Sequence, residues 1–82
     1  MIPIYGFLEG DTVGLLVFAN FHDTAHDLIN KIQTSAAIRV KPHASMHLLY
    51  KESIIAAHVT VLEMGLQPLE HFFVVHGYAH HV

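Results

Sequence analysis

The sequence predicts an α+β fold in which a mixed sheet of four to five strands packs on one helix. Short apolar runs rich in β-forming residues are separated by turn signals, and one segment between them changes to helical spacing. The chain has 82 residues and no linker or low-complexity stretch, so it can build one modest core. We therefore expect a single domain over residues 1–82, in which residues 77–82 form a short C-terminal tail.

The first two strands are expected to form an antiparallel hairpin. The segment from Ile2 to Leu8 is apolar and rich in β-formers, and the turn signal Glu9-Gly10-Asp11 follows it. A second run of this kind extends from Thr12 to Ala19. Two such runs joined by a tight turn that contains glycine are typical of a hairpin.

A change of period predicts a helix at about Thr24 to Ala36. Thr24 and Asp27 resemble a capping box, in which a hydroxyl and a carboxylate each satisfy a free backbone amide at the helix start. Apolar residues then recur at spacings of three and four, which gives one stripe that can face the hairpin. The stripe consists of Ala25, Leu28, Ile29, Ile32 and Ala36.

Short strands and turns alternate in the second half of the chain. Thr60 and Glu63 form a second capping box, which opens one helical turn closed by Gly65. The remaining elements are a loop at Arg39–Ser45, a third strand at Met46–Tyr50, a turn at Lys51-Glu52-Ser53, a short fourth strand at Ile54–Ala57, an extended Gln67-Pro68 and a last strand at Glu70–Val75. This order matches the β-grasp, or ubiquitin-like, fold, in which the first and last strands pair in parallel at the sheet centre.

Hydrophobic residues occupy both faces of the predicted sheet, although a half-exposed sheet should carry polar residues on its outer face. The chain is 52% hydrophobic and 13% charged, whereas ordinary domains are about 25% charged. An untidy alternation in a small sheet is one explanation, and a docking surface is the other. On the second, the interface residues are Tyr5, Phe7, Leu16, Phe18 and Phe73, with the outward parity left open.

Composition argues against several other classes. Four Lys or Arg face seven Asp or Glu, a formal charge of −3 without a basic patch, so we expect no nucleic-acid partner. No apolar stretch reaches the roughly 18 residues of a membrane span, and the start MIPIYGFLEGD does not resemble a signal peptide. The absence of cysteine excludes disulfides and thiolate metal sites, and it fits a cytoplasmic protein.

The nine histidines do not form a recognisable metal site, and no catalytic constellation is evident. His76 and His80 have i, i+4 spacing and His81 follows, but zinc needs three or four converging ligands with ordered surroundings. The serines lack a nucleophile context, and GFLEGDTVG lacks the lysine of a phosphate-binding loop. We expect no metal, no cofactor and no catalytic residue in this chain.

Three stretches of the sequence resemble known families. HDTAHDLINKIQ, residues 22–33, is similar to the start of the ubiquitin helix. The stretches Arg39-Val40-Lys41-Pro42 and Thr60 to Glu70, with the pattern Gly-Leu-x-Pro-x-Glu, are similar to the small B-type (gamma) subunit of toluene and related aromatic or alkene monooxygenases. The resemblance covers about residues 2–76. Departures are the Ile38-Arg39 pair, where relatives tend to have consecutive arginines, and the histidine-rich ending.

The resemblance implies a non-catalytic, cytoplasmic subunit of a soluble multicomponent di-iron monooxygenase. Its partner is expected to be the large hydroxylase subunit, which holds the di-iron centre, and the substrates are expected to be aromatic or alkene hydrocarbons. The alternative is a free-standing ubiquitin-like interaction module without conjugation activity, because the ending GYAHHV lacks a Gly-Gly tail. A histidine metal protein is the third hypothesis.

Overall fold

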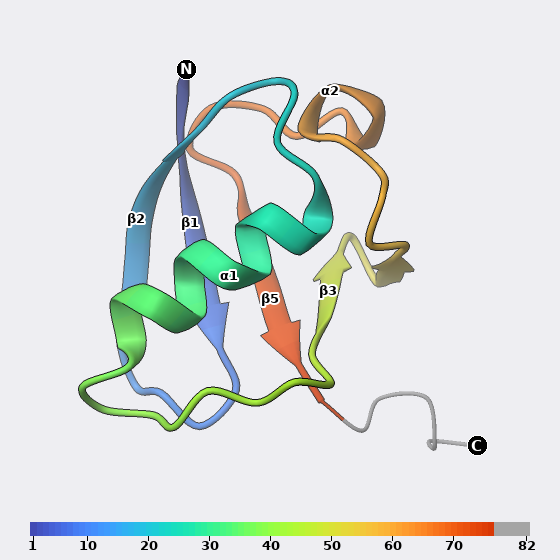
Figure 1. Cartoon of the computed structure of the whole chain (residues 1–82). Coiled ribbons are helices and arrows are strands. Elements are labelled where there is room, and N and C mark those ends of the chain that lie inside the picture. The colour runs from blue at the N-terminus through green and yellow to red at the C-terminus, as the bar shows by residue number, and fades with distance from the viewer. Residues whose placement is uncertain (77–82) are drawn as a thin grey trace.

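A five-stranded mixed sheet with one main helix across one face forms the fold, in a computed structural model that describes residues 1–76 (Figure 1). The strand order is β2-β1-β5-β3-β4, and β1 and β5 pair in parallel as predicted. The predicted α+β class is confirmed. The elements are β1 (Ile2–Leu8), β2 (Gly14–Ala19), α1 (Ala25–Ala36), β3 (His47–Tyr50), β4 (Ser53–Ile55), α2 (Val61–Met64) and β5 (His71–Val75).

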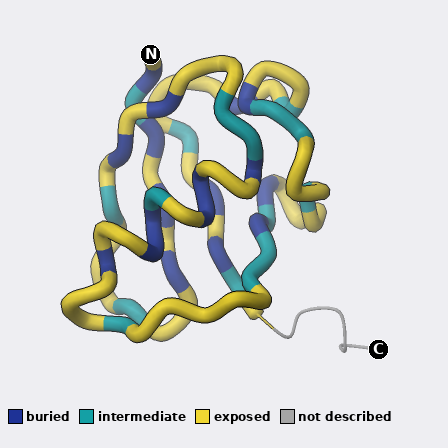
Figure 2. The backbone as a smooth tube through the Cα atoms, in the orientation of Figure 1, coloured by how far each residue is buried: buried dark blue, intermediate teal, exposed yellow. Residues whose placement is uncertain are grey.

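The core lies between the sheet and α1, and alternate residues of each central strand turn towards it (Figure 2). The predicted stripe of α1 is buried throughout. The largest fully buried side chains come from both layers: Phe72, Ile4, Leu28, Ile32, Leu48, Val61 and Val74. Gly6 of β1 lies under the helix, where an added Cβ atom would come 2.2 Å from Cδ1 of Ile32. The helix therefore packs closely on the sheet because this position has no side chain.

Both predicted capping boxes are present, and they face each other. Thr24 accepts a hydrogen bond from the Asp27 N–H at 3.1 Å, and Thr60 accepts one from the Glu63 N–H at 3.1 Å. An antiparallel bridge joins Thr24 to Thr60. Gly65 ends α2 in the left-handed conformation, with φ of 76°. The two helix starts thus hold each other in place at one end of the sheet.

The second strand begins at Gly14 and not at Thr12, so this predicted boundary is wrong. The Val13 N–H donates to Asp11 Oδ1 at 3.3 Å, and Asp11 is in turn held by Arg39. These contacts keep residues 12 and 13 in the connection. A pairing of Gly14 with Phe7 then starts the ladder.

The fourth strand is also displaced, to Ser53–Ile55. Lys51 and Glu52 both adopt positive φ, which makes a two-residue turn and brings Ser53 opposite Tyr50. Ala57 leaves the sheet because its carbonyl oxygen accepts a hydrogen bond from His26 N–H at 3.1 Å, at the start of α1. The prediction of Ile54–Ala57 failed because this tertiary contact competes with strand pairing.

Two further boundaries differ, because β3 begins at His47 and β5 begins at His71. Gln67-Pro68 does not simply extend the chain before β5. Pro68 and Leu69 form a turn in which Leu69 has φ of 68° and the Glu70 N–H donates to the Gln67 carbonyl at 3.1 Å. The predicted tail at 77–82, including His80 and His81, lies outside the described residues.

Candidate protein-docking surface

The sheet face turned away from α1, called the outer face below, carries all five predicted interface residues. They come from three adjacent strands, and their exposed fractions run from 38% for Tyr5 to 54% for Phe18. The buried parity of each strand is the other one, for example Ile4 in β1 and Phe72 in β5. The structure therefore resolves the parity that the sequence left open. The five residues are Tyr5, Phe7, Leu16, Phe18 and Phe73.

Strand register brings the side chains of the outer face into contact. Tyr5 pairs with Leu16 across β1 and β2, and Phe7 pairs with Phe73 across β1 and β5. The rings of Phe7 and Phe73 have centroids 5.6 Å apart. Phe7 also covers Gly14, at which a Cβ atom would come 2.5 Å from the ring. The aromatic residues thus form one surface rather than isolated exposed positions.

The outer face also includes residues that the sequence reasoning did not single out. His71 packs edge-on against Phe73, with ring centroids 5.3 Å apart. Its position two residues before Phe73 was an available signal. Leu49 and Ile54 could be placed on the outer face only from the strand register. Leu49 pairs with Phe73 of β5, which is distant in the sequence, and Ile54 pairs with Leu49 across the β3–β4 turn. The further residues of this face are Pro3, His47, Leu49, Ile54, His71 and Val75.

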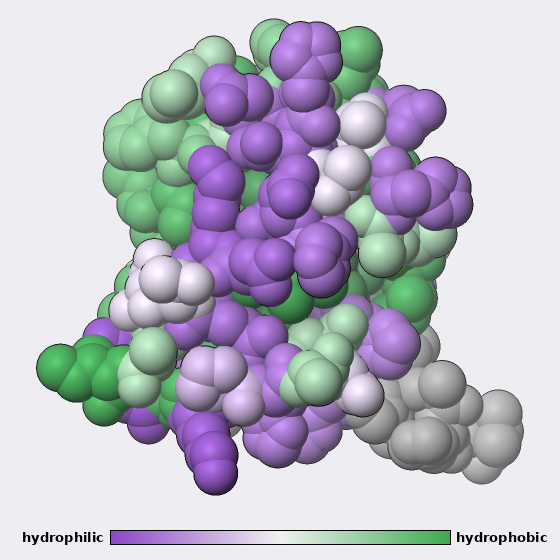
Figure 3. Space-filling model, in the orientation of Figure 1, coloured by the Kyte–Doolittle hydropathy of each residue, from purple (hydrophilic) through white to green (hydrophobic). Residues whose placement is uncertain are grey.

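Charged side chains gather elsewhere on the molecule. None of the outer-face residues is Asp, Glu, Lys or Arg. The opposite side, over α1, is largely hydrophilic (Figure 3). The molecule is therefore polarised: a hydrophilic helix side and an apolar sheet side. An uncharged, aromatic-rich sheet face is typical of a surface that another protein covers.

Ion pairs at the ends of the sheet hold its frame. Arg39 donates two hydrogen bonds to Asp11 Oδ2, from Nη2 at 2.9 Å and from Nε at 3.1 Å, and Nε also donates one to Oδ1 at 3.0 Å. This guanidinium lowers the pKa of the Asp11 carboxyl below its ordinary value. The contact ties the β1–β2 turn to the segment after α1. Arg39 belongs to the stretch on which the family resemblance rests, and its role here is structural.

A second frame contact surrounds Glu70. Its carboxylate accepts a hydrogen bond from the Tyr50 hydroxyl and another from the Gln67 N–H at 2.8 Å. The Tyr50 hydrogen bond is the main cause of a lowered pKa of Glu70, and burial is the main cause of a raised pKa of Tyr50. The pair fixes the turn before β5. These shifts have a structural cause and do not indicate an acid–base site.

Within residues 1–76, no group of three or more His, Asp or Glu side chains lies close enough together to hold a metal ion. His43 and His76 stack with ring centroids 5.1 Å apart, and His76 Nε2 lies 3.7 Å from Glu9 Oε2. His80, the other member of the predicted i, i+4 pair with His76, lies outside the described residues. In the same part of the chain, no helix is long and apolar enough to cross a membrane.

Solved structures of other proteins share the fold described above. A chain of the toluene 4-monooxygenase HD complex with the inhibitor 4-bromobenzoate superposes with a TM-score of 0.82 at 25% identity, covering 92% of this chain and 96% of that one. A chain from a structure on molecular mimicry of SUMO in DNA repair gives 0.74 at 18% identity, covering 90% and 89%. ATBAG1 in complex with HSP70 gives 0.76 at 12% identity, covering 93% and 40%. The last two show the fold alone.

Sequence comparison agrees with the family resemblance. No curated protein sequence matches the chain. The family model described as toluene-4-monooxygenase system protein B (TmoB) matches residues 1–76, which is nearly the whole chain. The resemblance identified from Arg39–Pro42 and Thr60–Glu70 is thereby confirmed. This chain belongs to the TmoB family, the B proteins of toluene-4-monooxygenase systems.

Proposed function

We propose that this chain is a non-catalytic small subunit of a cytoplasmic di-iron monooxygenase, and that its outer face docks on the large hydroxylase subunit. The substrates of the complex would be aromatic or alkene hydrocarbons. Membership of the TmoB family and the similarity to a chain of a toluene 4-monooxygenase complex support a place in a monooxygenase system. The docking role itself rests on the chemistry of the sheet.

The observation that carries the proposal is the contiguous, uncharged outer face. Phe7 and Phe73 pack on each other there, yet each remains about two-fifths exposed, at 39% and 40%. Aromatic side chains in the centre of a patch supply much of the energy of a protein interface when a partner buries them. Exposed in a free protein, the same surface would favour aggregation. A permanent partner that covers it resolves this conflict.

The proposal assigns the metal chemistry to the large subunit and a structural role to this chain. The family resemblance implies that carboxylate and histidine ligands for two iron ions lie in the large subunit. Among residues 1–76 of this chain, no three or more His, Asp or Glu side chains are grouped closely enough to hold a metal ion. Its carboxylates serve helix caps and ion pairs, as Asp27 and Asp11 do. We infer that the small subunit contributes to the stability of the hydroxylase and supplies no reacting group.

The replacement Phe73→Asp tests the docking surface. A carboxylate at the centre of the outer face would have to be desolvated in the complex, so we expect binding to the large subunit to weaken by at least a hundredfold. Phe73 is 40% exposed in the free chain, and the domain should remain folded. Co-purification of the co-expressed subunits and titration of the large subunit with the purified variant measure the effect.

The matched control is Ile38→Asp, which introduces the same charge at a side chain that is 89% exposed and lies outside the outer face. This variant should bind like the unaltered chain. Equal binding by Phe73→Asp and Ile38→Asp would contradict docking through the outer face. A chain that never co-purifies with the large subunit, and instead sediments as a discrete oligomer, would favour the free-standing interaction module.

A further inference from the structure

Strand β2 forms one edge of the sheet, and apart from a Lys31 contact at the Phe18 carbonyl oxygen it lacks the usual protection of an edge strand. Its sequence, GLLVFA, extends over six residues and contains no charge and no proline. Natural proteins shorten, charge or cover such edges, because their free N–H and C=O groups pair readily with other chains. The opposite edge, β4, has three residues. An edge like β2 is therefore expected to be covered in the working assembly.

The backbone groups of Leu16 and Phe18 point away from the sheet at this edge. The Tyr5 N–H donates to the Glu70 carbonyl oxygen at 2.9 Å, so Tyr5 directs its backbone groups towards β5. Tyr5 lies opposite Leu16 in the register, which makes this a pair without mutual hydrogen bonds. Leu16, and Phe18 two residues further on, consequently direct their N–H and C=O groups to the open side.

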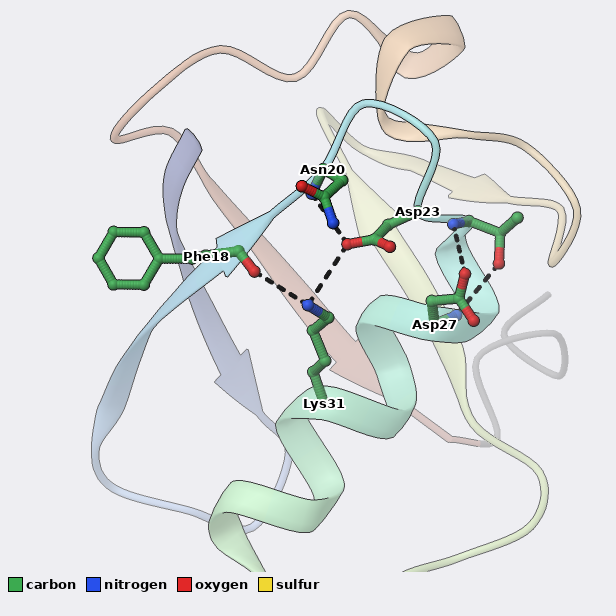
Figure 4. A network of polar contacts seen from close by, with 6 residues as sticks. Phe18, Asn20, Asp23, Asp27 and Lys31 are labelled. Atoms are coloured by element: carbon green, nitrogen blue, oxygen red, sulfur yellow. Dashed lines mark hydrogen bonds and ion pairs between the residues drawn. The ribbon is translucent and has the colours of Figure 1, made fainter. Parts of the chain in front are cut away.

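A contact of Lys31, in α1, is consistent with the Phe18 carbonyl group pointing to the open side of β2. Lys31 also lines a groove beside this edge. Its Nζ donates to the Phe18 carbonyl oxygen at 3.0 Å and lies 3.4 Å from Asp23 Oδ2, while the Phe18 ring points the other way (Figure 4). An ammonium group has three N–H donors, so one is left for a ligand. The groove has a volume of about 450 Å³ and is lined by Val17, Phe18, Asn30, Lys31, Thr34 and Ser35.

We propose that an extended segment of the large subunit pairs with β2 as a sixth strand of the sheet, with a carboxylate side chain directed at Lys31. The inference rests on the proposed function, because it names the part of the partner that binds and the atoms that receive it. In strand addition, main-chain hydrogen bonds give affinity and pockets for alternate side chains give specificity. The N–H and C=O of Leu16 and the N–H of Phe18 are the groups that the added strand would pair.

The chemistry of the occupant follows from the two surfaces that it would meet. Side chains of one parity would lie beside those of Leu16 and Phe18, extending the outer face, and are therefore apolar. Side chains of the other parity would enter the groove, where Lys31 is the one charged residue among the lining side chains. Asp23 already pairs with this ammonium group, and a carboxylate of the added strand would accept the one N–H donor that remains. The edge is continuous with the proposed docking surface, because Leu16 and Phe18 belong to both.

The test compares Leu16→Pro with Leu16→Ala. Both remove the leucine side chain from the outer face, but only proline removes the outward N–H group and blocks an added strand with its ring. We expect Leu16→Pro to bind the large subunit at least tenfold more weakly than Leu16→Ala. In the complex of the unaltered chain, the amides of Leu16 and Phe18 should exchange with deuterium at least tenfold more slowly than in the free chain. Equal affinity of the two variants, with no change in amide exchange, overturns the strand addition.

A second pair keeps the test decisive if Leu16→Pro does not fold. Thr34→Trp fills the groove from an exposed position on α1, and Ile38→Trp places the same ring outside it. Only Thr34→Trp should weaken binding; equal binding of the two tryptophan variants counts against an occupied groove. Failure of the proposed function is distinct, because the unaltered chain would then not bind the large subunit at all. If Phe73→Asp loses binding while Leu16→Pro binds like Leu16→Ala and Thr34→Trp binds like Ile38→Trp, docking through the outer face stands and only the strand addition is overturned.

Discussion

Two glycines show how one small sheet combines a closely packed core face with an exposed outer face. Gly6 and Gly14 lie on opposite faces of it, and each is covered by a side chain from a neighbouring element, Ile32 and Phe7 respectively. The first contact belongs to the core and the second to the outer face. A side chain at Gly6 would push the helix off the sheet, and one at Gly14 would displace the Phe7 ring from its place on the outer face. Small residues therefore set the spacing of both the core and the proposed interface.

The replacement Gly6→Ala should destabilise the domain by about 1–3 kcal/mol, because the new methyl group would overlap the end of Ile32. Its distance to Cδ1 of Ile32 would be 2.2 Å before relaxation. Adding Ile32→Val removes that atom, and the double variant should lose less stability than the sum of the two single changes. Urea denaturation of the four proteins measures this coupling. Strict additivity would show that Ile32 is not the obstacle.

At the scale of elements, local chemistry accounts for where helices start and turns form. The capping residues Thr24 and Thr60 lie where the sequence placed them, since each box closes hydrogen bonds within four residues. Strand ends were less predictable. Ala57, for example, serves the start of α1 instead of extending β4. Such competition between distant partners cannot be read from the pattern of one segment.

The turn before β5 gives a test at this scale. Leu69 has φ of 68°, a conformation that glycine adopts at lower cost, and its side chain is 62% exposed. We expect Leu69→Gly to raise the free energy of unfolding by about 0.5–1 kcal/mol. Leu62→Gly, at a side chain that is 66% exposed within α2, should lower it by about 1 kcal/mol. Thermal unfolding of the two variants measures both, and a shift in the same direction would contradict the strain at Leu69.

On the scale of the whole molecule, polar contacts connect the segments at the ends of the sheet, while one sheet face forms the core and the other is exposed. Asp11 with Arg39 and Glu70 with Tyr50 connect segments far apart in the sequence. Both carboxyls have lowered pKa values, as do those of Asp27 and Glu63 in the capping boxes. A carboxyl group whose pKa is lower in the folded state than in the unfolded state stabilises the fold at pH values above its unfolded-state pKa. This stabilisation is lost as the pH falls through the folded-state pKa.

Arg39→Gln tests this linkage. With its main partner gone, the folded-state pKa of Asp11 should rise towards its ordinary value of 3.8. We expect the variant to be less stable than the unaltered chain at pH 7. The difference should shrink below pH 3.8 and vanish once Asp11 is protonated in both folded proteins. Urea denaturation at pH 7, 4 and 2.5 gives the comparison.

Lys41→Gln is the matched control, because it also removes one positive charge, from an exposed side chain two residues further on. Its effect on stability should be small and should not follow the protonation of Asp11. A pH-independent loss in Arg39→Gln, or an equal pH dependence in both variants, would show that the Asp11 contact does not govern this part of the acid response.

The sequence by itself determined the order of elements, both capping boxes, the helix stripe and the presence of hydrophobic residues on both sheet faces. These depend on interactions within a few residues and on the periods of two and 3.6 residues. Only the tertiary structure decided which parity faces outwards, how Leu49 and Ile54 join the outer face, and that β2 is an open edge beside α1. Pairing partners and faces are selected by contacts between distant segments, since both parities of an apolar strand satisfy the local pattern equally well.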